Sequence, residues 1–120
     1  MADDPIIEPS AIADLRALSP DAGPEFLREL IEIYFQDIPE RFAEIDRGLA
    51  KPDAILVARA AHTIKGSSSN FGAKRLAKVA HEMELSGKAG DIAAASANYG
   101  RLRTEYELVS SGLKQVLADL

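Results

Sequence analysis

A histidine and a lysine one helical turn apart, His62 and Lys65, are the side chains of this sequence best suited to chemistry. In an α-helix successive residues advance by about 100° around the axis, which places Arg59, Lys65, Gly66 and Ser69 within about 60° of His62. Apolar residues collect on the opposite side, so His62 is predicted to lie on the water-exposed face. An imidazole, a neighbouring cation and a bare stretch of backbone are suited to holding a phosphoryl group on nitrogen.

Gly66 is the least ordinary residue of this face. A glycine inside a helix costs roughly 1 kcal/mol relative to alanine. Such a glycine often marks the close approach of another backbone or of a ligand, although on its own it leaves a structural and a functional role about equal. Ser67 and Ser68 project inward or sideways, where they are expected to pack or to bond back to helix carbonyls.

Length and composition describe one folded domain. The chain has 120 residues, 47% apolar and 28% charged, with no cysteine and no apolar run near the roughly 20 residues that cross a bilayer. Its net charge of −5 argues against general nucleic-acid binding, which needs a basic surface. The acidic N-terminus is unlike a secretory signal. We therefore expect a cytoplasmic protein that binds neither membrane nor nucleic acid.

Helical periodicity runs along nearly the whole chain, and strand signals are almost absent. A short first helix is predicted to begin at Ser10 as N-cap and to carry Ile12, Leu15 and Leu18 on one face. Residues 19–23 are expected to form a turn.

A long second helix is predicted from about Pro24, because proline is favoured in a first helical turn. Pro39 lies inside it and is expected to kink or interrupt it. Residues 51–53 interrupt the helical pattern. The third helix follows, contains His62 and ends at Gly72, a natural left-handed cap.

The fourth helix is expected to end at residues 87–90, and the last to run from about Asp91. The apolar stripe of the fourth helix consists of Leu76, Val79, Ala80 and Met83. Four sizeable helices joined by short turns pack most simply as an up-down antiparallel four-helix bundle, with the short N-terminal helix as a cover. We therefore predict an all-α fold with a single domain over residues 1–120.

The third and fourth helices should form a tight hairpin about Gly72. Glu82 lies as far after this glycine as His62 lies before it, so residues 81–85 are the candidates to border His62. Helix rotation decides which of them faces it, and the sequence leaves that open. His81 lies opposite the apolar stripe and is interpreted as exposed and non-catalytic.

Residues 61–73 resemble the signature of histidine-containing phosphotransfer (HPt) domains, which reads His-x-x-Lys-Gly, two small residues, two variable positions, an apolar residue and Gly. The match is complete over that span and includes the costly glycine. Residues 26–27, Pro39 and Leu76 also fall where this family places them, so the resemblance covers most of the chain.

This resemblance implies a phosphorelay intermediate. His62 would accept a phosphoryl group from the aspartate of one receiver domain and pass it to another, the partners being receiver domains of hybrid histidine kinases and response regulators. The family has no catalytic machinery or cofactor of its own, and Mg²⁺ would sit on the receiver. Lys65 would neutralise the phosphoryl oxygens, and Gly66 would leave room for the receiver.

Three further residues are assigned by the resemblance and by their place on the helix to the phosphoryl or partner surface: Arg59, Ser69 and Glu84. Related proteins often carry glutamine at the position of Glu84. A carboxylate there could bond to a neutral imidazole but would repel the phosphorylated form, so the role of Glu84 stays open.

Other functions remain as alternatives. The signature is shared by the phosphorylatable domain of chemotaxis-type kinases, although the end of the chain at Leu120 favours a stand-alone shuttle. Nothing in the surface pattern demands a dimer, so a monomer is expected. A hydrolase would need His62 to activate Ser67 or Ser69, and a helical adaptor would not need His62 at all. A metal-binding bundle would have to use His62, His81, Glu82 and Glu84.

Overall fold

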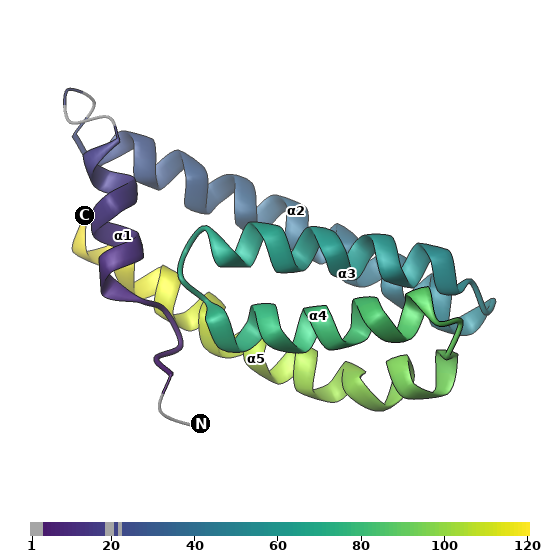
Figure 1. The fold of residues 1–120 in the computed structure, drawn as a ribbon. Helices are drawn as coiled ribbons and strands as arrows, with labels where there is room; N and C mark the ends of the chain where they lie inside the picture. Colours follow the sequence, from purple (N-terminus) through teal and green to yellow (C-terminus); the bar gives the residue numbers. More distant parts are fainter. Residues whose placement is uncertain (1–3, 19–20, 22) are drawn as a thin grey trace.

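The computed structural model describes residues 4–18, 21 and 23–120, and the described chain is helical throughout apart from its turns. The helices are α1 (Pro9–Ala17), α2 (Glu25–Ala50), α3 (Ala54–Ser69), α4 (Lys74–Lys88) and α5 (Ile92–Asp119). Figure 1 shows α2 to α5 running alternately in opposite directions, with α1 at the end where α2 begins and α5 finishes. The predicted up-down four-helix bundle with an N-terminal covering helix is confirmed.

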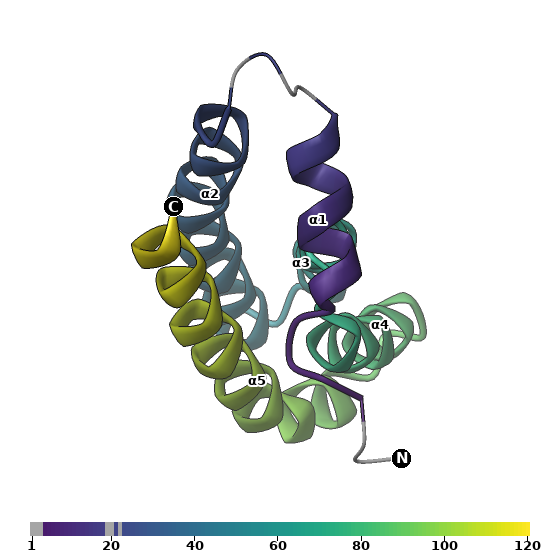
Figure 2. The same ribbon diagram turned by 90° about the vertical axis from the view of Figure 1, so that its left-hand side faces the viewer.

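The view along the bundle in Figure 2 shows that its helices are unevenly spaced. Helices α3 and α4 form the most extensive helix pair, α4 also packs on α5, and α3 on α2. Helix α1 contacts α2 more sparsely. The hairpin of α3 and α4 is therefore the most firmly fixed part of the fold, and it carries the histidine and its surroundings.

Aspartate side chains begin two of the helices. The Asp53 carboxylate accepts a hydrogen bond from the backbone N–H of Leu56 at 3.1 Å, and the Asp91 carboxylate accepts one from Ala94 at 3.0 Å. Each satisfies one of the N–H groups that a first helical turn leaves without a partner. These caps fix the starts of α3 and α5, in agreement with the predicted interruption at residues 51–53 and the predicted start near Asp91.

Gly72 joins α3 to α4 with a backbone φ of +69°, the left-handed conformation predicted for it. A side chain here would also collide with the N-terminal segment, because a Cβ atom would lie 2.5 Å from the Cβ of Glu8 and 2.8 Å from that of Ala11. The Glu8 N–H donates to the Gly72 carbonyl at 3.1 Å. The residues before α1 are thus attached to the turn of the α3–α4 hairpin.

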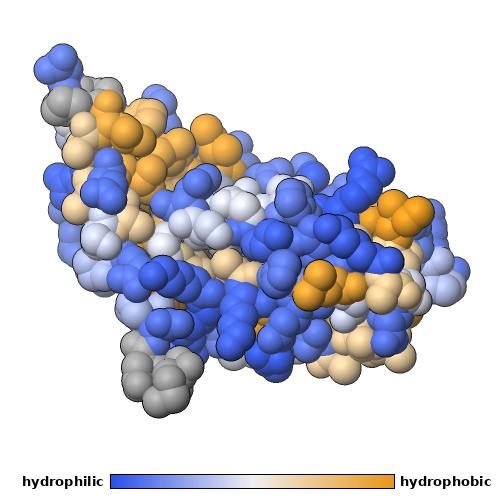
Figure 3. Space-filling view, in the orientation of Figure 1, coloured by the Kyte–Doolittle hydropathy of each residue, from blue (hydrophilic) through white to orange (hydrophobic). Residues whose placement is uncertain are grey.

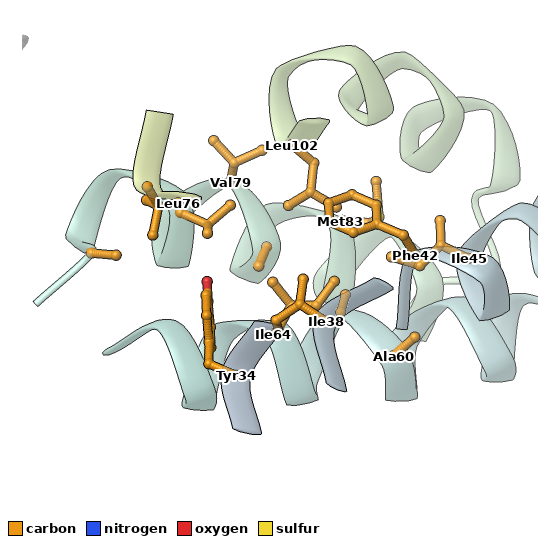
Figure 4. Close-up of a cluster of buried hydrophobic side chains, with 14 of the residues drawn as sticks. Tyr34, Ile38, Phe42, Ile45, Ala60, Ile64, Leu76, Val79, Met83 and Leu102 are labelled. Atoms are coloured by element: carbon orange, nitrogen blue, oxygen red, sulfur yellow. The ribbon is translucent and has the colours of Figure 1, made fainter. Parts of the chain in front are cut away.

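The core is a continuous cluster of aliphatic and aromatic side chains along the bundle axis (Figure 4). It contains the predicted stripe of α4 in full, since Leu76, Val79, Ala80 and Met83 are all buried. From α3 it receives Ile64, whose burial leaves the opposite face of the same helix to solvent. Apolar burial of this kind is the main favourable term in folding.

A buried hydrogen bond joins α2 to α3 at the edge of this core. The hydroxyl groups of Tyr34 and Ser68 lie 2.9 Å apart, and both side chains are almost fully buried. Burial raises the pKa of Tyr34 well above its ordinary value, although the bond to Ser68 acts in the opposite direction. Ser68 therefore faces the core as predicted.

A double-mutant cycle tests the hydrogen bond between Tyr34 and Ser68. We expect Tyr34→Phe alone to cost about 1–3 kcal/mol of unfolding free energy, because the Ser68 hydroxyl would lose its partner inside the core. Tyr34→Phe combined with Ser68→Ala should cost less than the single change, since neither polar group is then left unpaired. Chemical denaturation measures both values, and a double variant as unstable as the sum of the singles would contradict this account.

Two details of the sequence prediction were wrong, the N-cap of α1 and the interruption at Pro39. Helix α1 is capped by Glu8 and begins at Pro9, so Ser10 lies within it. Leu18 lines the same hollow as Leu15, in agreement with their predicted common face, and is 69% exposed.

Helix α2 continues through Pro39 without interruption, which is possible because Pro39 lies on the exposed side where water can reach the freed carbonyl. Helix α4 ends at Lys88, within the predicted range 87–90; Gly87 is buried in its last turn, and Gly90 takes the left-handed conformation with φ +72°. In the predicted turn at 19–23, Ser19, Pro20 and Ala22 lie outside the described residues. No helix in the described ranges has the length and hydrophobicity of a membrane span.

Candidate functional site

His62 lies in the middle of α3 with its side chain 66% exposed, on the face opposite the core. Its Nδ1 atom is 2.8 Å from Oε2 of Glu84, which reaches across from α4. The imidazole is therefore held on one side and open to solvent on the other.

Glu84 is the centre of the site. Its side chain is only 3% exposed, yet it carries a carboxylate surrounded by nitrogen atoms. Lys65 Nζ lies 2.7 Å from Oε1, and Lys88 Nζ lies 3.2 Å from Oε2. His81 Nδ1 is 3.7 Å from Oε1. A buried charge survives in a fold only when it is paired in this way.

These contacts decide the ionisation of Glu84. Burial alone would raise the pKa of this carboxyl, but hydrogen bonds from Lys65, Lys88 and His62 outweigh it and lower the pKa to about 2. Near neutral pH Glu84 is a carboxylate, which can only accept hydrogen bonds. His62 Nδ1 must therefore be the donor, and in the neutral imidazole Nε2 then carries the free lone pair.

A close approach of α3 and α4 brings Glu84 within reach of His62. Gly87 lies one turn after Glu84, and a Cβ atom on it would be 2.8 Å from the backbone nitrogen of Ala58 and 2.9 Å from the carbonyl oxygen of Ala54. Only a glycine fits at this contact. Ala58 lies one turn before His62, so the contact sets the helix spacing next to the His62–Glu84 bond.

Gly66 leaves the surface beside His62 bare. It is exposed, and a Cβ atom placed on it would meet nothing within 4 Å. Packing inside this chain therefore does not require glycine at this position. The Ser69 hydroxyl, on the same face, donates to the Lys65 carbonyl at 2.8 Å. Ser69 is thus occupied with its own helix.

A hollow of about 410 Å³ adjoins His62 on the side away from Gly66. It is lined by Ala58, Arg59, His62, Thr63, Glu84 and Lys88. Arg59 and Lys88 put two cations on its border. The middle of the surface formed by α3 and α4 is mainly hydrophilic, whereas hydrophobic surface is most extensive toward the end of the bundle where α1 and α2 lie, with smaller patches toward the opposite end (Figure 3).

The structure brings together most of the residues predicted for the site. Arg59, His62, Lys65 and Gly66 share one face of α3, as predicted. The residue of α4 that faces His62 is Glu84 and not Glu82, the one at equal distance from Gly72.

Glu82 points toward α5 instead, where its carboxylate accepts a hydrogen bond from Arg101 at 3.2 Å. His81 is exposed, as predicted, and its Nδ1 lies 3.3 Å from Lys65 Nζ, so it borders the site. The rotation of α4, which hairpin counting leaves open, decides both positions.

Lys88 is a site residue that the sequence reasoning missed. Its spacing of four from Glu84 was available as a signal, because oppositely charged residues at that spacing meet on a helix.

The metal-binding and hydrolase alternatives can be compared with this geometry. Among the residues that the structure describes, no group of three or more His, Cys, Asp or Glu side chains is placed to hold a metal ion.

For a hydrolase, neither candidate serine is placed to be activated by His62. Ser69 donates to the Lys65 carbonyl, and Ser67 lines a hollow with side chains of α1 and α2, to which His62 does not contribute. An activated serine needs its base within hydrogen-bond reach.

Comparison with known proteins places the chain in a family. The Hpt domain profile matches residues 29–112, well over half of the chain, and the chain therefore belongs to the Hpt domain family. It is 33% identical over 66 residues to histidine-containing phosphotransfer protein 2 of Arabidopsis thaliana, covering 52% of this chain and 42% of that protein. It is 38% identical over 66 residues to the chemotaxis protein CheA of Rhizobium meliloti, covering 48% of this chain and 9% of CheA. The chain thus spans less than half the length of these relatives.

Solved structures agree in fold. Histidine-containing phosphotransfer protein B (HptB) of Pseudomonas aeruginosa superposes with a TM-score of 0.87 and 28% identity, covering 97% of each chain. The phosphotransfer protein MtHPt2 of Medicago truncatula superposes with a TM-score of 0.82 at 24% identity, covering 94% of this chain and 78% of that one, a likeness of fold.

Proposed function

We propose that this chain is a phosphoryl carrier of a multistep phosphorelay, in which His62 accepts a phosphoryl group from the aspartate of one receiver domain and passes it to another. The observation that carries the proposal is the bond between His62 Nδ1 and the buried Glu84 carboxylate, 2.8 Å long. Family membership and the HPt relatives support the same reaction.

The bond prepares His62 as a nucleophile. With its proton on Nδ1, the imidazole presents the Nε2 lone pair toward solvent, where it attacks the phosphorus of an aspartyl phosphate. The P–N bond forms as the P–O bond breaks, and the aspartate leaves as a carboxylate. Positive charge developing on the ring is stabilised through Nδ1–H by Glu84, a carboxylate already in place before the reaction.

This geometry revises the expected repulsion between Glu84 and the phosphorylated histidine. The phosphoryl group on Nε2 lies on the far side of the ring from Nδ1 and its bond to Glu84. Lys65 and Lys88 also compensate the charge of that carboxylate. A carboxylate at this position is therefore compatible with a phosphorylated His62.

The partner supplies what this chain lacks. We propose that receiver domains of hybrid histidine kinases and response regulators bring the aspartate and its Mg²⁺, that residues 1–120 act as one HPt domain without a cofactor or catalysis of their own, and that the chain works as a monomer. Because such partners signal inside the cell, the proposed place of action is the cytoplasm.

An apolar hollow of about 420 Å³ near the site supports docking of a protein partner. It lies between α1, α2 and α3, and Ser67 and Asn70 of α3 line it together with apolar side chains. Two of these, Leu18 and Ile33, are 69% and 60% exposed. Exposed apolar area next to a polar reaction centre is typical of protein interfaces.

A second candidate is supported by the match to CheA. In that case an ATP-dependent kinase domain would phosphorylate His62 directly. Incubating the chain with phosphorylated receivers in one arm, and with a CheA-type kinase and ATP in the other, separates the two. Rapid label transfer in the receiver arm supports the relay, and transfer confined to the kinase arm supports the second candidate.

Gly66 gives a direct test of partner approach. We expect Gly66→Gln to leave the unfolding free energy unchanged or to raise it by up to about 1 kcal/mol, because a side chain has open space there and glycine is a poor helix former. Phosphoryl exchange with a receiver should fall at least tenfold, since a misplacement of about 1 Å costs rates of that order or more. A stopped-flow assay measures the transfer rate, and thermal unfolding measures the stability. An unchanged transfer rate would rule out a role of Gly66 in the approach of the receiver.

A further inference from the structure

The cation that the sequence pattern assigns to the phosphoryl group is already engaged. Lys65 Nζ lies 2.7 Å from Glu84 Oε1 and 3.3 Å from His81 Nδ1, and the Lys65 side chain is only 28% exposed. Moving it to a phosphoryl group would strip a buried carboxylate of its closest countercharge, which is costly. Lys65 is better placed to hold Glu84 than to follow a group that comes and goes on His62.

Arg59 is differently placed. It lies one turn before His62 on the same exposed face, and it lines the hollow of about 410 Å³ that adjoins the imidazole. Within the described ranges no ion pair holds its guanidinium, whereas Lys65 and Lys88 are both paired with Glu84. A guanidinium offers two parallel N–H groups whose spacing matches two phosphoryl oxygens.

We propose that the phosphoryl group of phospho-His62 lies over this hollow, and that Arg59, not Lys65, binds its oxygens. The inference rests on the proposed function for its biological meaning and goes beyond it by naming the residue that binds the phosphoryl group. Arg59 approaches from the side opposite Gly66, so the bare surface at Gly66 remains free for the receiver. Lys65 becomes a positioning residue that acts on His62 through Glu84.

The lifetime of phospho-His62 reports whether a cation binds the phosphoryl group, because hydrolysis changes the charge on that group. In the loose transition state of phosphoryl transfer, the departing group carries less negative charge than the dianion on the histidine. A bound cation therefore stabilises the starting state more and slows hydrolysis. Losing one charge contact at about 4 Å in water-like surroundings corresponds to about a fivefold change in rate.

The experiment needs no receiver. Phosphoramidate phosphorylates imidazole directly: its own P–N bond breaks, a new one forms to His62, and ammonia leaves. The chain is labelled in a His81→Gln background so that one histidine reports, and hydrolysis is followed by ³¹P NMR at neutral pH. The variants are Arg59→Gln, Lys65→Gln and, as a matched control on α5, Arg101→Gln.

We expect Arg59→Gln to shorten the half-life about fivefold and Arg101→Gln to leave it unchanged. Lys65→Gln should change the half-life less than Arg59→Gln and should instead disturb the ¹⁵N signal of His62 Nδ1 before phosphorylation. In the wild-type chain, the Arg59 Nε–H signal should move on phosphorylation. An unchanged half-life in Arg59→Gln, or a larger effect of Lys65→Gln, would overturn the inference. Failure to exchange with any receiver would instead count against the proposed function.

Discussion

We expect His62→Gln to abolish phosphoryl acceptance completely, while the fold keeps its stability to within about 0.5 kcal/mol. His62 is 66% exposed, and the amide of a glutamine can still donate to the buried Glu84 carboxylate, so neither a core contact nor the pairing of Glu84 is lost. Glutamine preserves a polar group toward Glu84 but has no nitrogen lone pair that can attack phosphorus. Radiolabel transfer from a phosphorylated receiver, with circular dichroism on the same samples, measures both quantities.

His81→Gln is the matched control for this experiment. His81 is half-exposed and touches the same carboxylate, with Nδ1 3.7 Å from Glu84 Oε1. If the role of His62 is chemical, His81→Gln should keep full labelling and change the transfer rate only a few-fold. Equal loss in both variants would show that the assay reports disruption of the Glu84 cluster and not the loss of an acceptor.

The second large effect concerns Glu84. We expect Glu84→Gln to slow phosphoryl acceptance about fivefold, because a hydrogen bond to a charged acceptor exceeds one to a neutral acceptor by about 1 kcal/mol. Glutamine can still accept from His62 Nδ1 but cannot stabilise charge on the ring or pair with Lys65 and Lys88. Glu82→Gln is the control, since that carboxylate lies on the same helix and bonds to Arg101 instead. The ¹⁵N spectrum of His62 separates an effect on the tautomer from one on the fold.

Glu84 also makes stability depend on pH. Its pKa is lowered from 4.5 to about 2 on folding, so the ionised carboxylate favours the folded state. This contribution is fully present above about pH 4.5, and it is lost as the pH falls through about 2. The shift corresponds to a contribution on the order of 3 kcal/mol. Denaturant unfolding at a series of pH values should show this acid-dependent component in the wild type and its loss in Glu84→Gln. A pH profile that Glu84→Gln leaves unaltered would contradict the pairing described for this carboxylate.

Much of the fold could be predicted because periodicity and turn chemistry are local. The apolar stripe of α4, the caps at Asp53 and Asp91 and the left-handed turn at Gly72 all depend on residues close in sequence. The effect of Pro39 was misjudged because it depends on whether that part of the helix meets solvent or core. That is a property of the assembled bundle.

In the site, too, some features follow from the local sequence and others depend on how the helices pack. The exposed face of His62 and Gly66 follows from helix geometry alone. The partner of His62 depends on the rotation of α4, which is set where Gly87 packs on Ala58. Hairpin counting therefore left residues 81–85 as candidates, of which Glu84 faces His62, and the engagement of Lys65 by Glu84 was not visible in the sequence. The motif thus places His62 on an exposed face correctly but leaves open how the neighbouring Lys65 is paired, which packing across the hairpin decides.

The most direct measurement is transfer of a labelled phosphoryl group through the full chain, from one receiver domain to a second, with the bond located by ¹⁵N and ³¹P NMR on the intermediate. The account predicts an acid-labile, base-stable label on Nε2 of His62, with Nδ1 still protonated, that is chased quantitatively onto the second receiver. A label on Nδ1, on another residue, or one that no receiver can remove would contradict it.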